Sequence, residues 1–241
     1  CIRDSSYYAF LVYNICISAA NADLEVFMII RDVMTKNPVC VTEDTTVTDA
    51  KALMLKNGFS KLPVKDKSER LIGVITKNDI QKASPSDATT LDMFEIGYLL
   101  SKLTVGKFMT KKVLTVQETE VVEEAARIMV DNNIGCIPVM KDEVLVGIVT
   151  ESDLFSLFTE MFGARHSGIR AVISLPDKPG ELSAILLKIA ELKGNLVSVV
   201  TREVKDIGCR RSTIKVTDIT VKQMEEILKS SDAEIIDLRV I

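Results

Sequence analysis

The chain contains no tryptophan and only one histidine among its 241 residues. Histidine is the commonest metal ligand and general base, so its near absence argues against most metal centres and acid–base catalytic groups. The single histidine, His166, lies in a short segment between two glycines, where a catalytic role is not expected. Five cysteines lie far apart without a C-x-x-C pair, which favours a reduced cytoplasmic protein over a disulfide framework or a zinc site.

The sequence also has no excess of basic residues and no apolar run long enough to span a membrane. Lys and Arg number 30 against 34 Asp and Glu, and the charges are interspersed, so nucleic acid is not indicated as a partner. Residues 7–20 form a short apolar run followed by small residues, which imitates an export signal. Met28 resembles a natural start ahead of the patterned sequence, so we favour an N-terminal extension outside the fold for residues 1–27 and predict no membrane partner.

What the sequence does contain is an internal repeat. The copies are 75 residues apart at the proline of the motif and 74 residues apart at its closing aspartate. A repeat that occurs twice predicts a pseudo-symmetric pair with a cleft along its two-fold axis. The repeated segments are Met34-Thr35-Lys36 with Met109-Thr110-Lys111, Pro63-Val64 with Pro138-Val139, and residues 73–79 with residues 147–153.

Each copy predicts the order strand, helix, strand, strand, helix. The helix is predicted from apolar residues at helical spacing, over residues 47–54 and 122–129. Thr46 with Asp49 predicts a capping box at the first helix start, and Gly58 and Asn133 predict the two helix ends. The strands are predicted at residues 38–41, 61–64 and 71–75 in the first copy and at residues 113–116, 136–139 and 144–149 in the second, with closing helices from near Asp79 and Asp153.

The proline strand and the closing pattern G-h-h-T-x-x-D, where h is apolar, resemble the CBS domain over residues 31 to about 160. The resemblance implies that two CBS domains, residues 28–86 and 105–162, pair as a Bateman module that senses an adenosine-containing ligand. A helix over residues 91–103, within a connecting segment 87–104, would pack across the pair. Residues 154–162 are strongly apolar and predict the closing helix of the second copy, a dimer-forming surface, or both.

The ligand site is predicted at the end of the closing strand in each copy. A threonine there and an aspartate three residues later can converge, the carboxylate accepting from ribose hydroxyls and the hydroxyl donating to a ligand oxygen. The prolines would hold a strand edge open to an adenine. The predicted nucleotide-binding residues are Pro63, Thr76, Lys77 and Asp79 in the first copy and Pro138, Thr150 and Asp153 in the second.

Two features qualify this site. The alternative function of each Thr-x-x-Asp motif is a helix N-cap, although its double occurrence favours the ligand. The second copy carries Glu151 where the first has Lys77, and a carboxylate repels phosphate. The first pocket is therefore the better candidate for a charged nucleotide, and the second is expected to hold a less charged adenosine ligand or nothing.

The last 73 residues, 169–241, predict a third unit after a linker over residues 163–168. Its order βαββαβ predicts a ferredoxin-like sandwich, with strands at 169–175, 195–203, 209–216 and 233–240 and helices at 182–192 and 221–228. The linker glycines would absorb a rigid-body movement. The segment from Asp177 to Leu182, followed by Gly194-Asn195, resembles the ACT domain.

The ACT resemblance implies an amino-acid effector bound at an interface between two such domains. The residues assigned to it are Asp177, Gly180, Glu181, Leu182 and Asn195. The carboxylate of the effector would lie at the helix N-terminus, where Gly180 permits close approach. The open alternative is that Pro179-Gly180 only forms a turn and that the unit only dimerises.

The whole arrangement, an α/β (α+β) chain with paired CBS domains and a C-terminal ACT domain, resembles the acetoin-utilisation regulatory proteins of bacteria. We therefore expect a cytoplasmic, homodimeric, non-enzymatic ligand sensor without a cofactor. Its regulatory ligand would be AMP, ADP or ATP, with an amino acid as second effector. The alternatives are a dimerisation scaffold without ligand and an accessory regulator of acetoin or carbon metabolism acting through a partner enzyme. The sequence contains no glycine-rich phosphate loop and no nucleophile beside a base, which disfavours an enzyme.

Overall fold

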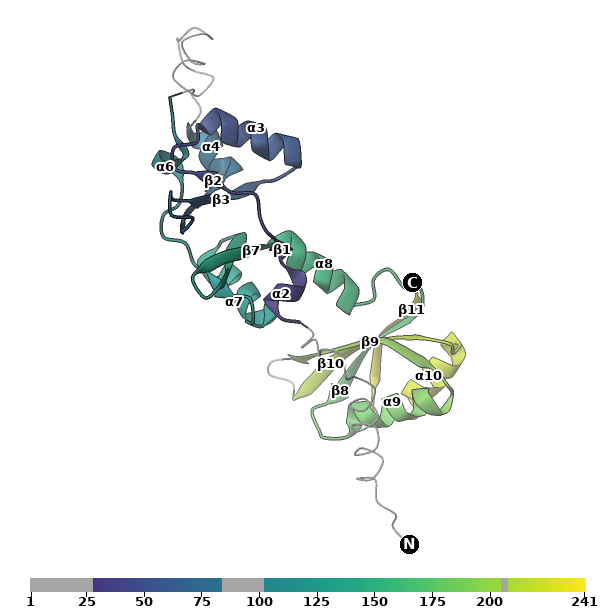
Figure 1. Cartoon of the computed structure of the whole chain (residues 1–241). Coiled ribbons are helices and arrows are strands. Elements are labelled where there is room, and N and C mark those ends of the chain that lie inside the picture. The colour runs from purple at the N-terminus through teal and green to yellow at the C-terminus, as the bar shows by residue number, and fades with distance from the viewer. Residues whose placement is uncertain (1–27, 84–101, 205–207) are drawn as a thin grey trace, which may run out of the picture. The chain divides into compact units, whose positions relative to one another are not determined.

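A computed structural model describes residues 28–83, 102–204 and 208–241 (Figure 1). The chain divides into two compact units, one ending at Glu151 and the other beginning at Ser152. The predicted extension over residues 1–27 and nearly all of the predicted helix over 91–103 lie outside the described residues. Within the described ranges, no helix has the length and hydropathy needed to cross a bilayer.

Both repeats have the predicted order of elements. Only the first strand of each copy is shorter than predicted, because β2 and β5 pair with their neighbours over just two residues, beginning at Val41 and Val116. The first repeat contains β2 (Val41–Thr42), α3 (Val47–Asn57), β3 (Lys61–Lys65), β4 (Leu71–Thr76) and α4 (Lys77–Ala83). The second contains β5 (Val116–Gln117), α7 (Val122–Asn132), β6 (Cys136–Lys141), β7 (Val144–Thr150) and α8 (Glu151–Met161).

The helices α3 and α7 end at the predicted residues, and α3 begins with half of the predicted capping box, because Asp49 Oδ2 accepts from the Thr46 hydroxyl and not from its backbone N–H. Thr46 Oγ1 accepts a hydrogen bond from the backbone N–H of Asp49 at 3.0 Å, which satisfies one free N–H at the start of α3. The left-handed residues Gly58 (φ 71°) and Asn133 (φ 52°) end the two helices. Three of the four apolar positions predicted to face inward are buried in each helix, namely Val47, Ala50 and Met54 in α3 and Val122, Ala125 and Met129 in α7. The fourth, Leu53 or Ile128, is half-buried.

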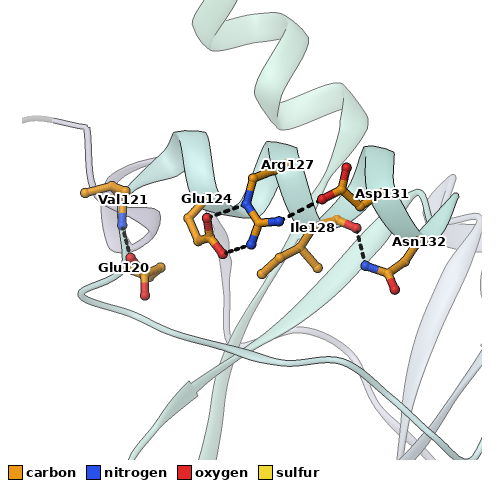
Figure 2. Close-up of polar contacts among 7 residues, drawn as sticks. All are labelled: Glu120, Val121, Glu124, Arg127, Ile128, Asp131 and Asn132. Carbon is orange, nitrogen blue, oxygen red and sulfur yellow. Dashed lines mark hydrogen bonds and ion pairs between the residues drawn. The ribbon is translucent and has the colours of Figure 1, made fainter.

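The outer face of α7 carries a charge network that Figure 2 shows. The Arg127 guanidinium donates to Glu124 Oε2 at 2.8 Å and to Asp131 Oδ2 at 2.7 Å. The hydrogen bond from Arg127 lowers the pKa of the Glu124 carboxyl. Such exposed pairs contribute little to stability, so their main effect is to order the helix surface. At the helix end, the Asn132 side-chain amide donates to the carbonyl of Ile128 at 2.9 Å.

The two repeats exchange their Met-Thr-Lys segments. Thr35, in β1 (Thr35–Lys36), pairs with Ile148 of β7, so the first copy's segment completes the second copy's sheet, ordered β1-β7-β6-β5. In return, Thr110 bridges to Val74 of β4 in the sheet β2-β3-β4. Two short helices, α2 (Ile30–Val33) and α6 (Val105–Phe108), lead into these segments. The first backbone N–H of α2 donates to the carbonyl of Glu120 in the second repeat, and that of α6 donates to the carbonyl of Thr45 in the first. The pair is therefore one interlocked structure.

The exchange explains why Gly73 and Gly147 occupy equivalent positions of the two repeats. A Cβ atom on Gly73 would lie 2.5 Å from Met109 Sδ and 3.0 Å from the carbonyl oxygen of Thr110. A Cβ atom on Gly147 would collide with Met34 Sδ in the same way. Each methionine thus packs over the glycine of the sheet that receives its segment, and no larger residue fits beneath it.

The second unit is a ferredoxin-like sandwich, as predicted. Its antiparallel sheet has the order β11-β8-β10-β9, and two helices pack on one face, leaving the other face without a helix from this motif (Figure 1). The core between them includes Ile173, Ile185, Ile214 and Met224. The elements are β8 (Ile169–Pro176), α9 (Glu181–Glu191), β9 (Asn195–Val204), β10 (Cys209–Thr217), α10 (Val221–Lys229) and β11 (Glu234–Val240).

The linker after α8 is tied to this sheet. Gly163 is left-handed (φ 55°), and its N–H bonds to Glu160 while the N–H of Ala164 bonds to Thr159, the pattern of a Schellman helix end. Lys215, only 2% exposed, donates from Nζ to the carbonyl of Gly163 at 2.7 Å. This ammonium caps the negative end of α8 from the open sheet face. The rigid-body movement expected at the linker glycines stays a prediction.

The helix α8 lies where the closing helix of the second repeat was predicted, although all of it except Glu151 belongs to the second compact unit. It buries no residue completely, and its apolar residues Phe155 and Phe158 are 72% and 58% exposed. The rings of Phe158 and Phe162 stack with centroids 4.8 Å apart. The expected role of this surface in dimer formation stays a prediction.

Candidate functional site

Two cavities lie between the repeats within the first unit. One, of about 410 Å³, is lined by Lys61, Val74 and Thr76 of the first repeat. Its lining residues from the second repeat are Thr110, Lys112, Val113, Leu114, Asn132, Ile134, Gly135 and Cys136. The other, of about 430 Å³, is lined by residues 60–61 and 76–78 together with 133–135 and Glu151. Lys61, Thr76, Ile134 and Gly135 line both, so the cavities adjoin across these four residues.

Lys61 links the two repeats at this point. It is the first residue of β3, and its Nζ donates to the carbonyl oxygen of Gly135 and lies 4.0 Å from Glu151 Oε2. Its side chain is 19% exposed, against 61% for Glu151, so the ammonium is the better shielded of the two charges. Burial raises the pKa of the neighbouring Cys136 thiol, while the positive charge of Lys61 lowers it. A shielded cation with few partners is suited to meet an anionic ligand group.

The first Thr-x-x-Asp motif forms the helix cap that was its alternative interpretation. Thr76 donates to Asp79 Oδ2 from both its backbone N–H, at 2.9 Å, and its hydroxyl, at 2.7 Å. The N–H of Asp79 returns a bond to Thr76 Oγ1 at 3.3 Å. Since the hydroxyl proton points to Asp79, Thr76 faces the cavities as an acceptor, whereas donation to the ligand was expected. Capping and ligand binding are compatible, because Thr76 still lines both cavities.

The two prolines mark where strand pairing stops. Pro63 pairs with Val74 of β4, and pairing with β2 begins only at the next residue, Val64. Pro138 likewise precedes Val139, where pairing with β5 begins. Pairing with β2 and β5 thus stops at the predicted residues. Both prolines are buried and neither lines the two cavities described, so an edge open to an adenine stays a prediction.

The second motif differs from the expectation of two separate pockets. Lys77 begins α4 and Glu151 begins α8, and both line the 430 Å³ cavity. Equivalent residues of the two repeats face one cavity when that cavity lies near the pseudo-two-fold axis. Residue spacing alone does not show whether two such residues share a cavity. Glu151 and Lys77 line the same cavity. Thr150 ends β7 and Asp153 lies in α8, and neither lines the two cavities described.

Several cavity residues were not selected from the sequence. Lys61 directly precedes the Leu-Pro motif, and Thr110 belongs to the repeated Met-Thr-Lys segment, so both had a local signal. Lys112 and Gly135 had none, because their place depends on the exchange of segments. Lys112 adds a second cation to the 410 Å³ cavity.

The residues assigned to an amino-acid effector do not all lie together. Asp177 forms an ion pair of 2.6 Å with Arg210, a residue that was not predicted as part of the site. Gly180 (φ 97°) precedes α9, and a Cβ atom there would have nothing within 4 Å. Glu181 and Leu182 follow in α9, with Leu182 packed on the core. Asn195 pairs with Thr217, whereas β8 ends beside Cys209 at the opposite end of the sheet. A single chain therefore does not assemble the whole set.

Comparisons with known proteins concern the repeat pair. The family model of the CBS domain matches residues 30–86 and 105–160. An uncharacterised protein of Methanocaldococcus jannaschii is 34% identical over 151 residues, covering 53% of this chain and 89% of that protein. A CBS domain-containing protein of Dictyostelium discoideum is 30% identical, covering 56% of this chain and 93% of the relative. A homoserine O-acetyltransferase of Methanosalsum zhilinae is 33% identical, but the match spans 52% of this chain and only 23% of that enzyme.

Three solved structures each align with a little over half of this chain. A CBS domain pair in complex with 5′-methylthioadenosine and S-adenosyl-L-methionine is 29% identical with a TM-score of 0.46, covering 58% of this chain and 98% of the other. CBSX2 in complex with AMP is 30% identical with a TM-score of 0.44, covering 54% and 96%. A protein described as an acetoin utilization protein of Vibrio cholerae is 26% identical with a TM-score of 0.49, covering 58% and 96%. From the matched family model and the well-covered relatives, the chain belongs to the CBS-domain family and carries a pair of CBS domains.

Proposed function

We propose that the CBS pair is a non-catalytic cytoplasmic sensor that binds AMP, ADP or ATP in the two adjoining cavities. The observation that carries the proposal is the position of Lys61 and Thr76, which line both cavities from the ends of neighbouring strands. Each cavity has a volume within the usual range for small-molecule sites. The CBS family resemblance supports an adenosine ligand.

The lining chemistry suits each part of a nucleotide. Val74, Val113, Leu114 and Ile134 provide an apolar wall for a base. Thr76 Oγ1 can accept from a ribose hydroxyl, since its own proton is directed to Asp79. Lys61, Lys77 and Lys112 face the cavities against one carboxylate, that of Glu151, which leaves an excess of positive charge for phosphate. The base and the phosphates are thus assigned to different walls.

The direct test is a thermal-shift series on the full chain with adenosine, AMP, ADP, ATP and amino acids. A ligand at 100 times its dissociation constant adds about 2.7 kcal/mol to the unfolding free energy and raises the melting temperature. A shift with AMP, ADP or ATP supports the sensor. No shift with any nucleotide would favour the dimerisation scaffold instead.

Glu151→Gln should tighten binding of phosphate-bearing nucleotides by about 1.4- to fivefold and leave adenosine unchanged. The carboxylate is largely exposed, so its repulsion of phosphate is of the order of 0.2–1 kcal/mol. Isothermal titration calorimetry of both ligands measures the difference. Glu160→Gln, an exposed change in the same helix α8, is the matched control and should alter neither affinity. Equal tightening for adenosine would show that the effect is not electrostatic.

Asp79→Ala should weaken nucleotide binding at least about tenfold, and Asp153→Ala should weaken it less. Asp79 lines neither of the two cavities but holds the Thr76 hydroxyl, which lines both. A tenfold loss corresponds to a charge-assisted hydrogen bond from a ribose hydroxyl to the Asp79 carboxylate, worth about 1.5–3 kcal/mol. Calorimetry on both variants gives the comparison, with circular dichroism as a check that α4 remains folded. A larger loss in Asp153→Ala would reverse this ranking.

We infer that the second unit binds an amino acid when two copies associate, which the ACT resemblance supports. The open space at Gly180 and the ion pair of Asp177 with Arg210 form one end of the sheet, and Asn195 would have to come from a second copy. The exposed Phe155 and Phe158 of α8 support a homodimer. Light scattering at micromolar concentration tests this, and a monomer mass would contradict it. The alternative function is that of an accessory regulator, which would act on acetoin metabolism through a partner enzyme.

A further inference from the structure

The face of the second sheet opposite α9 and α10 carries two arginines directly opposite each other. Arg211 of β10 pairs in register with Arg202 of β9 on one side and with Ser174 of β8 on the other. Side chains alternate along a strand, and Ile214, three residues after Arg211, lies in the core beneath the helices. Arg211 therefore projects from the opposite face, and its cross-strand partners share that face.

This arrangement is unfavourable as it stands. Like charges directly opposite on neighbouring strands destabilise a sheet. Arg211 Nε is buried and has no hydrogen-bond partner, and a buried donor without an acceptor is costly. Within the described residues, neither arginine forms an ion pair with a carboxylate. Glu234 of β11 lies opposite Ser174, two strands from Arg211, which is about 10 Å at the usual strand spacing.

The other cations of the same face are satisfied. Arg170 and Arg239 bind Asp237 at 3.1 and 2.6 Å, and the hydrogen bond from Arg239 is the main cause of the lowered pKa of that carboxyl. Lys215 binds the carbonyl of Gly163. The absence of a partner is thus particular to the Arg202–Arg211 pair among the described cations of this face. Arg211 lies between Ser174 of the central strand β8 and Arg202 of the edge strand β9.

We propose that Arg202 and Arg211, with Ser174, form a binding site for a phosphate group carried by a small molecule. Two guanidinium groups present planar sets of N–H donors that match phosphate oxygens, and their two charges match a phosphomonoester at neutral pH. The Ser174 hydroxyl supplies a further donor. The anion removes the repulsion between the arginines and satisfies the buried Nε. This site lies in the second unit and does not depend on nucleotide binding by the CBS pair.

The test uses the full chain carrying Lys61→Met, so that the lysine-lined cleft contributes less to phosphate binding. Inorganic phosphate, phosphoserine and acetate are titrated at constant ionic strength and followed by amide NMR shifts. We expect phosphate and phosphoserine to shift residues of β9 and β10, and affinity to fall at least tenfold in Arg211→Gln and in Arg202→Gln. Arg239→Gln, which removes a paired cation from the same face, should retain binding. Binding of acetate as tight as phosphate would overturn the assignment to phosphate.

The melting temperature of the variants gives a second measurement, independent of the binding titrations. In phosphate-free buffer, Arg202→Gln should raise the melting temperature, because it relieves the repulsion between the arginines. In saturating phosphate the melting temperature of the unsubstituted chain should rise by about that difference, so that it matches Arg202→Gln. An equal melting temperature for the two proteins in both buffers, or phosphate shifts that persist unchanged in both glutamine variants, would refute the site.

Discussion

Lys61→Met should weaken binding of AMP, ADP or ATP by about tenfold or more. Methionine keeps an apolar stem of similar length but removes the shielded ammonium that lines both cavities. A hydrogen bond to a charged group is worth about 1.5–3 kcal/mol, and each 1.4 kcal/mol is a factor of ten in affinity. Isothermal titration calorimetry with each nucleotide measures the loss.

Lys65→Met is the matched control for this experiment. Lys65 lies at the other end of β3, pairs with Glu69 at 3.2 Å and lines neither cavity, so its replacement should leave affinity unchanged. Adenosine provides a second comparison, because it lacks the phosphates and should lose much less affinity in Lys61→Met. Unaltered binding of all three nucleotides in that variant would show that Lys61 only joins the repeats through Gly135 and Glu151.

Gly73→Ala should lower the unfolding free energy by about 1–3 kcal/mol, the cost of overfilling a packed site. The new Cβ would meet Met109 Sδ at 2.5 Å and the Thr110 carbonyl oxygen at 3.0 Å. The methionine can move, but the backbone carbonyl belongs to the exchanged segment and resists displacement. Urea unfolding monitored by circular dichroism measures the change in free energy.

Gly58→Asn is the control for the loss of a glycine in the same repeat. Gly58 is left-handed with nothing within 4 Å of a Cβ atom, and Asn133 occupies the equivalent position of the second repeat. Asparagine tolerates that conformation, so this change should be close to neutral. Equal destabilisation by Gly73→Ala and Gly58→Asn would argue against a steric role for the exchanged methionine.

The local elements could be predicted from sequence because their causes are local. Helical spacing of apolar residues defined α3 and α7, and the caps at Thr46, Gly58 and Asn133 depend on residues at most a few positions away. The βαββαβ order of the second unit follows from alternation and turns in the same way. The candidate site was predicted in part, since Thr76 and Lys77 lie at a strand end that the repeat marks twice.

Only the tertiary structure decided which distant residues meet. Thr35 and Thr110 could have paired within their own repeats, and the exchange is selected by backbone hydrogen bonds and by methionine packing over Gly73 and Gly147. Residue spacing carries no information about such pairings. It likewise could not show that Lys77 and Glu151 share one cavity. The sequence by itself determined the repeat, its elements and its chemical groups, while long-range packing determined which of those groups face one ligand, because contact depends on folded geometry and not on separation along the chain.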